Sequence, residues 1–199
     1  MSQAIPTSSS ELVLASYVSP IGRLTMAVGG GALVGLWAGG QRYFGRPAGV
    51  DEAGAASAPD LTIRGGRADA LAGVARGDAE SLAAAAAWLD DFFAGRRPSP
   101  ASVRLAPTGS EFQLRVWEAM ASIPYGTTLT YGRLAARLGG AGTPASPRAV
   151  GGAVARNPLL LIRPCHRVVA AAGAGGYAAG DEAKAWLLAH EAATASPIR

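Results

Sequence analysis

Short apolar runs dominate the first forty residues of the chain. The stretches 12–18, 24–28 and 32–37 are rich in aliphatic and aromatic residues, and three consecutive glycines at 29–31 separate the last two. Runs of this length joined by a glycine-rich turn are typical of β-strands in an antiparallel hairpin. We therefore predict a small antiparallel sheet at the start of the chain.

A helical spacing of apolar residues follows the predicted sheet. Gly95 ends this stretch, and Pro98 and Pro100 open a linker after it. The intervening segment 45–78 has weak periodicity and many small residues, which indicates a long loop with one strand near 61–64. The apolar stripe of the predicted helix consists of Leu82, Ala85, Ala86, Leu89 and Phe93.

The second half of the chain carries repeated helix-start signals. Ser110 followed by Gln113 matches a capping box, in which each side chain bonds the backbone N–H of the other residue. Asp181 is placed to cap the last helix of the chain. The buried stripe of the first of these helices would be Phe112, Val116 and Met120, and the last would carry Trp186, Leu187 and Leu188.

Two further helices are predicted as a pair. Thr130 is placed to cap a helix that Gly139 ends, and Ser146 followed by Pro147 opens another that runs to about Arg156. Two helices joined by a short glycine-containing segment indicate a helix-turn-helix.

These patterns predict an α/β N-terminal domain, a small antiparallel sheet plus a helix, followed by a mostly α C-terminal domain with a helix-turn-helix. The expected divisions are a disordered terminus at 1–10, the N-terminal domain at 11–100 and the C-terminal domain at 101–199. The start of the chain has no basic flank with an apolar stretch after it, and no segment is a convincing membrane span. We expect a cytoplasmic protein with no membrane partner.

Gly151 and Gly152 lie in the middle of the predicted helix that Ser146 and Pro147 open. Each glycine in a helix interior costs about 1 kcal/mol relative to alanine. Either another part of the protein packs closely at this point, or a bulky ligand approaches the helix. Because Arg148 lies just before them, a nucleic-acid groove is one such ligand.

Composition excludes several classes of protein. The chain has 199 residues, of which 49% are hydrophobic, and this supplies enough apolar surface for a packed core. Cys165 is the single cysteine and there are two histidines, so a disulfide scaffold and a Cys₄ or Cys₂His₂ zinc site are excluded.

The positive charge is unevenly distributed. The formal net charge is +4, and no acidic residue occurs from Ala119 to Gly180. Codon bias and a solvated face would explain an arginine-rich stretch, but its lack of acidic residues favours a polyanionic partner, above all nucleic acid. The arginines of this stretch are Arg133, Arg137, Arg148, Arg156, Arg163 and Arg167.

The candidate chemistry centres on Cys165. A sole cysteine is more often an inert buried residue than a nucleophile. However, His166 can act as a base beside it, and Arg163 and Arg167 are expected to raise the local potential and favour the thiolate. Glu191 is one of few carboxylates that could orient His166.

The second half of the chain, including the segment around Cys165, resembles the O6-alkylguanine-DNA alkyltransferase family. The resemblance covers nearly all of residues 107–191, and a weaker similarity extends to the family's small α/β domain at the N-terminus. The motifs that carry it are Gly109-Ser110-Glu111-Phe112-Gln113, Ile123-Pro124-Tyr125-Gly126, Arg148-Ala149-Val150-Gly151-Gly152-Ala153, Asn157-Pro158, Pro164-Cys165-His166-Arg167-Val168-Val169, Gly176-Tyr177 and Lys184 through Glu191.

The resemblance implies direct reversal of DNA damage by a protein that acts once. In that family a cysteine takes the alkyl group from O6-alkylguanine in DNA, and O4-alkylthymine is an expected second substrate. Cys165 would be the acceptor, His166 would take its proton through a water molecule, and Glu191 would polarise the imidazole. Asn157 would hold the turn that shapes the site, and Tyr131 would favour departure of neutral guanine.

The resemblance also implies how DNA is held. Arg148 would insert into the base stack of double-stranded DNA in place of a flipped nucleotide, and its helix would enter the minor groove with little sequence preference. The protein would act as a monomer, without a metal or organic cofactor. The DNA-binding residues would be Arg148, Ala149, Gly151, Gly152, Ala153 and Arg156, and the base pocket would be lined by Tyr131, Val168, Tyr177 and Ala178.

Two departures from the family pattern are expected to matter. Arg163 stands where an aliphatic residue usually precedes Pro-Cys, so it would alter the acidity of Cys165 or add a phosphate contact. Residues 139–145 form a longer link than usual between the paired helices, which affects the tilt of the second helix.

Three other functions remain open. A related protein that binds alkyl lesions without repairing them lacks the cysteine, so Cys165 argues against that function. A helix-turn-helix regulator would usually show a dimerisation stripe, and none is visible. A cysteine hydrolase would use Cys165, His166 and Glu191, although an adjacent cysteine and histidine are awkwardly placed for direct proton transfer.

Overall fold

A three-stranded antiparallel sheet forms the first layer of the protein. The structure, a computed structural model, describes residues 12–61, 67–139 and 145–195. The strands are β1 (Val13–Ser19), β2 (Gly22–Gly29) and β3 (Ala32–Ala38), paired in the order β1-β2-β3. Gly30 and Gly31, with φ of 61° and 73°, make the turn between β2 and β3, where a left-handed backbone favours glycine. The three predicted strands are confirmed.

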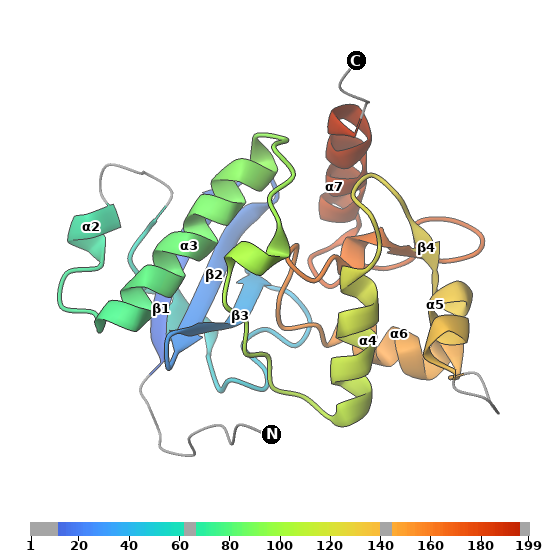
Figure 1. Cartoon of the computed structure of the whole chain (residues 1–199), viewed down its shortest axis with the longest axis horizontal. Helices are drawn as coiled ribbons and strands as arrows, with labels where there is room; N and C mark the ends of the chain where they lie inside the picture. The colour runs from blue at the N-terminus through green and yellow to red at the C-terminus, as the bar shows by residue number, and fades with distance from the viewer. Residues whose placement is uncertain (1–11, 62–66, 140–144, 196–199) are drawn as a thin grey trace.

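Helix α3 (Arg76–Phe93) lies across one face of this sheet (Figure 1). It begins several residues before the predicted stripe, and Gly95 with φ of 74° follows its end as expected. The Tyr17 hydroxyl donates to Asp90 Oδ1 at 2.9 Å and ties the helix to β1. The residues that α3 buries are Ser81, Leu82, Ala85, Ala86, Trp88, Leu89 and Phe92, so Phe92 takes the deeply buried place predicted for Phe93.

The segment 45–78 is not simply a loop. It holds two short helices, α1 (Glu52–Ala56) and α2 (Arg67–Ala70), that the weak apolar periodicity did not reveal. Asp51 caps α1 by accepting from the Gly54 N–H at 2.8 Å. Most of the strand predicted at 61–64 lies outside the described residues, as does the terminus 1–10.

Segments from the second half of the chain complete the exposed edge of β3. Leu33 exchanges backbone hydrogen bonds with residues 104–106, and Leu36 exchanges them with residues 158–160. Pairing in this way satisfies the backbone groups of an edge strand. It also fixes the start of the turn 157–165, which leads to Cys165, against the sheet.

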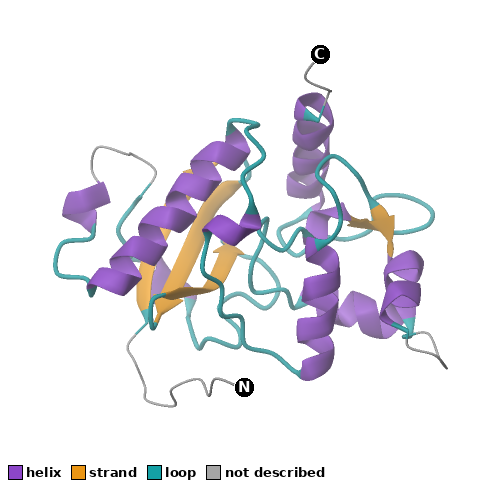
Figure 2. Cartoon of the chain, viewed as in Figure 1, coloured by secondary structure: helices purple, strands orange, loops and turns teal. Residues whose placement is uncertain are grey.

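The second half is mostly helical, as Figure 2 shows. Its helices are α4 (Glu111–Ala121), α5 (Tyr131–Leu138), α6 (Pro147–Ala155) and α7 (Asp181–Thr194). Two single-turn 3₁₀ helices, η2 (Pro100–Ser102) and η3 (Cys165–Arg167), and a two-stranded parallel pair, β4 (Leu129–Thr130) with β5 (Val168–Val169), join them. A small antiparallel sheet with helices, followed by a mostly helical region, is the fold class that the sequence predicts.

Two of the four predicted caps form and two do not. The capping box of Ser110 and Gln113 is present, and Thr130 Oγ1 accepts from the Arg133 N–H at 3.2 Å. Ser146 occupies the N-cap of α6 without a side-chain hydrogen bond. Asp181 is not a cap, because Gly180 takes the N-cap position and Asp181 becomes the first residue of α7. Its carboxylate there still faces the positive end of the helix dipole.

Helices α4, α5 and α6 pack against one another as a three-helix unit, and α5 and α6 are the predicted helix-turn-helix pair. The Trp117 indole N–H of α4 donates to the Ala153 carbonyl of α6 at 2.9 Å. Most of the link 139–145 lies outside the described residues, so its predicted effect on the tilt of α6 stays a prediction. None of the helices in the described ranges is long and apolar enough to span a membrane.

Candidate active site

Cys165 stands at the end of a tight turn that Asn157 holds together. The Asn157 amide nitrogen donates to the Arg163 carbonyl at 2.8 Å and to Cys165 Sγ at 3.2 Å. Its amide oxygen accepts from the Leu159 N–H at 3.1 Å. Leu161 adopts a φ of 67°, a strained left-handed conformation for a branched residue, within this turn. The role predicted for Asn157 as the holder of the turn is consistent with these contacts.

The Cys165 thiol is 3% exposed, and burial raises its pKa. The hydrogen bond from Asn157, the nearby Tyr177 hydroxyl and the positive charge of Lys184 lower the pKa of the thiol, but by less than burial raises it. The expectation that neighbouring arginines favour the thiolate is therefore wrong. Arg163 instead pairs with Glu118 at 2.8 Å, and Arg167 pairs with Glu191.

Glu191 gathers three partners into one buried cluster. His166 Nε2 lies 2.7 Å from Glu191 Oε1, and Arg167 donates to both carboxylate oxygens at 2.9 to 3.1 Å. The Gly126 N–H donates to Oε2 at 2.9 Å. Burial opposes ionisation of this carboxylate, but the hydrogen bonds from His166 and Arg167 lower the pKa of Glu191 to about 2. Glu191 is thus an ionised acceptor at neutral pH.

The protonation state of His166 follows from this cluster. Burial lowers the pKa of His166, so the imidazole is neutral at pH 7. Because Glu191 is ionised, the single ring proton lies on Nε2 and donates to it. His166 Nδ1 is then a lone-pair acceptor, and it is buried without a hydrogen-bond partner among the described residues. The site holds a poised base.

A cavity of about 260 Å³ opens beside the sulfur. Tyr131, Tyr177 and Ala178, three of the four residues predicted for a base pocket, line it together with Cys165. Val168 does not, because in β5 it pairs with Leu129 and its side chain is 0% exposed within the core. The remaining residues that line the cavity are Arg42, Val154, Ala155 and Gly176.

Two tyrosines of the cavity are protonated donors. Burial raises the pKa of Tyr131, and it raises the pKa of Tyr177 well above its ordinary value. The Tyr177 hydroxyl is buried and has no geometrically formed hydrogen bond in the described chain, although it lies close enough to Cys165 to influence the pKa of the thiol. The Tyr131 hydroxyl is available to donate to a ligand, whereas the Tyr177 hydroxyl is buried beside the sulfur.

Sequence reasoning missed two residues of the site. Lys184 is 1% exposed, and its ammonium donates to the Val168 carbonyl at 2.7 Å and to the Gly176 carbonyl at 3.3 Å, which fixes the loop under the cavity. A lone lysine in an apolar helix was a signal that could have identified it. Arg42 comes from the turn after β3, and nothing in its local sequence indicates that it reaches the cavity.

Helix α6 presents a small, open face beside this cavity. Arg148 is exposed in its first turn, while Val150, Ala153 and Val154 are buried. A Cβ on Gly151 would meet its nearest neighbour, the Tyr131 ring, at 3.9 Å, which is ordinary contact. Internal packing therefore does not explain this glycine, and of the two explanations considered the approach of a ligand remains.

Of the predicted DNA-binding residues, Ala153 does not lie on the open face. Its side chain is 4% exposed and packs into the core, and its carbonyl accepts from Trp117. Arg148, Ala149 and Arg156 are exposed, and Gly151 and Gly152 are partly exposed. Among the described residues, no three histidine, cysteine, aspartate or glutamate side chains are grouped as a metal site would require.

The fold and the site together define a helix-turn-helix protein in which a buried cysteine shares a cavity with the end of the second helix and is followed in the chain by a histidine paired with a buried glutamate. The family model of the 6-O-methylguanine DNA methyltransferase DNA-binding domain matches residues 111–193. The structure is similar to the O6-methylguanine methyltransferase of Mycobacterium tuberculosis, with a TM-score of 0.69 and 32% identity over 94% of this chain and 96% of that one. The chain belongs to the O6-methylguanine DNA methyltransferase family.

Three other comparisons agree with this membership. A methylated-DNA–protein-cysteine methyltransferase of Methanosarcina acetivorans is 50% identical over 50% of this chain and 62% of its own length. One from Salmonella typhimurium is 44% identical over 52% of this chain and 59% of its own. The chain thus aligns with about three fifths of these curated relatives. The M. tuberculosis protein in complex with DNA is similar over 91% of this chain and 93% of that one, with a TM-score of 0.69 and 31% identity.

Proposed function

We propose that this protein repairs alkylated DNA by moving the alkyl group from O6-alkylguanine onto Cys165, once per molecule. The observation that carries the proposal is the Cys165 sulfur on the wall of a base-sized cavity, next in the chain to the neutral base His166. The names of the relatives and the DNA-bound neighbour support the same activity. O4-alkylthymine, with a comparable alkyl–oxygen bond, is a second proposed substrate.

The proposed reaction is a displacement at carbon. The sulfur forms a bond to the alkyl carbon while the bond between that carbon and O6 breaks, and its electron pair goes to the guanine. The thiol proton passes through a water molecule to His166 Nδ1, whose positive charge Glu191 then stabilises. Tyr131, kept protonated by its raised pKa, donates a hydrogen bond to the leaving base. Guanine takes up one proton from solvent, and His166 returns the thiol proton to solvent.

A raised thiol pKa suits a nucleophile that acts only when its substrate is bound. The neutral thiol resists oxidation in the free protein, because the thiolate is the form that oxidants attack. With the base in the cavity, proton transfer to His166 accompanies attack, so a standing thiolate is not required. The alkyl group stays on the sulfur as a stable thioether and the free thiol is not regenerated, so each molecule reacts once.

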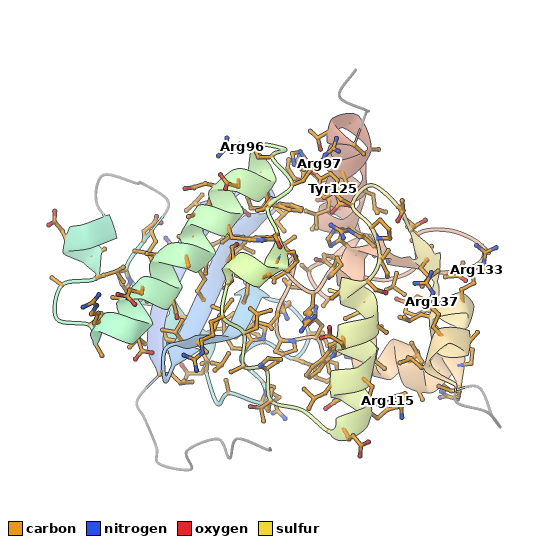
Figure 3. The ribbon with its side chains drawn as sticks, viewed as in Figure 1. Arg96, Arg97, Arg115, Tyr125, Arg133 and Arg137 are labelled. Carbon is orange, nitrogen blue, oxygen red and sulfur yellow. The ribbon has the colours of Figure 1, made fainter. Side chains whose placement is uncertain are left out.

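The DNA partner is proposed to lie against α6. A lesion inside a duplex is out of reach of a buried sulfur, so the nucleotide must leave the stack. Arg148, exposed in the first turn of α6, is placed to fill the gap, and Gly151 and Gly152 allow close approach of a minor groove. Figure 3 shows Arg133 and Arg137 on α5 and Arg115 on α4, where they offer phosphate contacts around this helix. We propose that a monomer suffices.

The test is an intact-mass measurement after incubation with duplex DNA that contains a single O6-methylguanine. The protein should gain one methyl group, the modified peptide should contain Cys165, and Cys165→Ala should gain none. Multiple turnover by one molecule would contradict the proposal. Turnover of an ester or peptide without any methyl transfer would instead identify a cysteine hydrolase.

Arg148→Ala tests the flipping role separately. It should slow transfer from duplex DNA far more than transfer from a free O6-alkylguanine base, since the free base has no stack to leave. Arg96→Ala, an exposed arginine at the end of α3 and far from α6 in Figure 3, is the matched control and should change neither rate. Equal slowing on both substrates would argue against a flipping role.

A further inference from the structure

Arg42 brings a positive charge from the N-terminal half of the chain to the mouth of the reactive cavity. It lies in the turn that follows β3, its side chain is exposed, and it is one of the residues that line the cavity with Cys165. Its backbone N–H donates to the Ala178 carbonyl at 3.3 Å, which anchors the turn to the opposite wall. Among the residues that line this cavity, Arg42 is the one arginine, lysine, aspartate or glutamate.

Tyr43 holds this arginine in place. The guanidinium carbon of Arg42 lies 4.9 Å from the centre of the Tyr43 ring, and that of Arg156, at the end of α6, lies 4.6 Å from it. Both distances are those of cation–π contacts. Tyr43 itself adopts a φ of 67°, an uncommon conformation for a residue other than glycine that tends to occur at functional sites.

The two arginines lack a carboxylate partner in the described part of the chain. Arg156 donates from Nη1 to the Gly152 carbonyl at 2.9 Å, and Arg42 makes no ion pair. Glu52, the acidic residue that touches this turn, accepts from the Gly40 N–H at 3.1 Å. Two cations held on one aromatic ring repel each other, and a bound anion between or beside them would relieve that repulsion.

We propose that Arg42 binds a backbone phosphate of the nucleotide whose base enters the cavity. The inference rests on the proposed function, because a base that reaches Cys165 brings its own sugar and phosphates to the cavity mouth. Guanidinium is planar and forms paired hydrogen bonds to phosphate oxygens. Tyr43 is a positioning residue that orients Arg42 through its ring. The N-terminal half thus takes part in holding the substrate nucleotide.

The first test compares two substrates. Arg42→Gln should slow methyl transfer from a duplex that contains one O6-methylguanine by roughly tenfold at sub-saturating DNA, the usual effect of losing a charged hydrogen bond. Transfer from free O6-benzylguanine, which has no phosphate, should be unchanged. Arg76→Gln removes an equal charge from the exposed start of α3 and should alter neither rate. An unchanged duplex rate, or equal slowing on both substrates, would overturn the proposal.

The second test identifies the phosphate and the role of Tyr43. In the wild-type protein, a neutral methylphosphonate at one of the phosphates flanking the lesion should slow transfer as much as Arg42→Gln does, and the variant should lose nothing more on that substrate. Tyr43→Phe should keep the wild-type duplex rate and Tyr43→Ala should match Arg42→Gln. Independent losses from the methylphosphonate and from Arg42→Gln would overturn the inference.

The outcomes also separate the two proposals. A wild-type protein that never acquires a methyl group would overturn the proposed function and this inference together. If the wild-type protein acquires the methyl group, and neither Arg42→Gln nor a methylphosphonate at any flanking phosphate changes the rate, the inference is overturned and the proposed function stands.

Discussion

At the residue scale, the chemistry depends on Cys165 being buried and protonated at rest. Burial raises the pKa of its thiol, and the Asn157 amide that donates to the sulfur partly offsets this. The sequence located this cysteine through its neighbours, but it predicted a thiolate because arginines flank the motif. Tertiary contacts reversed that prediction, since the charge of each arginine is matched by a glutamate.

Alkylation by iodoacetamide measures this property directly. At pH 7 the folded protein should react at least about tenfold more slowly than glutathione, because a raised pKa leaves little thiolate and the sulfur is 3% exposed. In denaturant the same thiol should react like an ordinary cysteine, and since it is the single cysteine the assay reports on Cys165 without ambiguity. Reaction at pH 7 that is fast and independent of pH would contradict this.

Glu191 links stability to pH. Its pKa is about 2 in the folded protein and near 4.5 in the unfolded chain, so its contribution is complete above pH 4.5 and is lost as the pH falls toward 2. The difference corresponds to about 3 kcal/mol of unfolding free energy. Urea denaturation of wild type between pH 5 and pH 2 should show this loss, and Glu191→Gln should remove the part of the pH dependence that Glu191 contributes.

The same variant has a second effect at pH 7. Glu191→Gln leaves the Arg167 guanidinium buried without its carboxylate, and the unfolding free energy should fall by about 3 to 5 kcal/mol. Glu80→Gln, which breaks an exposed pair with Arg76, should leave the unfolding free energy nearly unchanged, because solvent screens that pair. Similar losses in the two variants would show that Glu191 is not the centre of a buried network.

At the element scale, the glycines within α6 lower the stability of this helix and leave one of its faces open. Gly151 has room for a methyl group, so Gly151→Ala should raise the unfolding free energy by about 1 kcal/mol. It should also weaken binding to duplex DNA, because the added methyl lies on the face proposed to meet the groove. Urea denaturation and a DNA-binding titration of one preparation check both results.

A glycine of another helix provides the control for this effect. Gly77→Ala in α3 meets only Gly31 Cα at 3.6 Å, so it should stabilise the protein and leave DNA binding unchanged. If Gly151→Ala binds DNA as tightly as wild type, α6 does not meet the groove through this face.

Caps and turns show what local sequence decides at this scale. Ser110 with Gln113, and Thr130, formed the predicted caps because their partners lie three residues away. Asp181 did not, because Gly180, with φ of 93°, begins the helix one residue earlier than expected. The short helices α1 and α2 escaped prediction since too few apolar residues mark them.

At the scale of the whole molecule, segments of the second half pair with the edge strand β3 of the first half. We propose a boundary near residue 100, yet residues 104–106 and 158–160 both hydrogen-bond to β3, and one buried core contains side chains from both halves. Differential scanning calorimetry of the full chain should therefore show one cooperative transition, and the fragment 101–199 should show none, because its β-bridging segments lose their partner. Two separate transitions would contradict this coupling.

The sequence by itself determined which groups are neighbours along the chain and which local elements they form. The Pro-Cys-His-Arg run, the capping box and the strand and helix periodicities are local patterns, and local geometry converts them into elements with little outside help. From them follow the fold class, the candidate nucleophile Cys165 and its neighbour His166, while the family resemblance selected Glu191 among the few candidate carboxylates.

Only the tertiary structure decided the electrostatic state and the membership of the site. Burial set the pKa of Cys165, strand pairing turned Val168 into the core, and a turn more than one hundred residues earlier delivered Arg42 to the cavity mouth. These outcomes depend on which surfaces are removed from water and which distant segments meet. Neither quantity is encoded in the order of neighbouring residues.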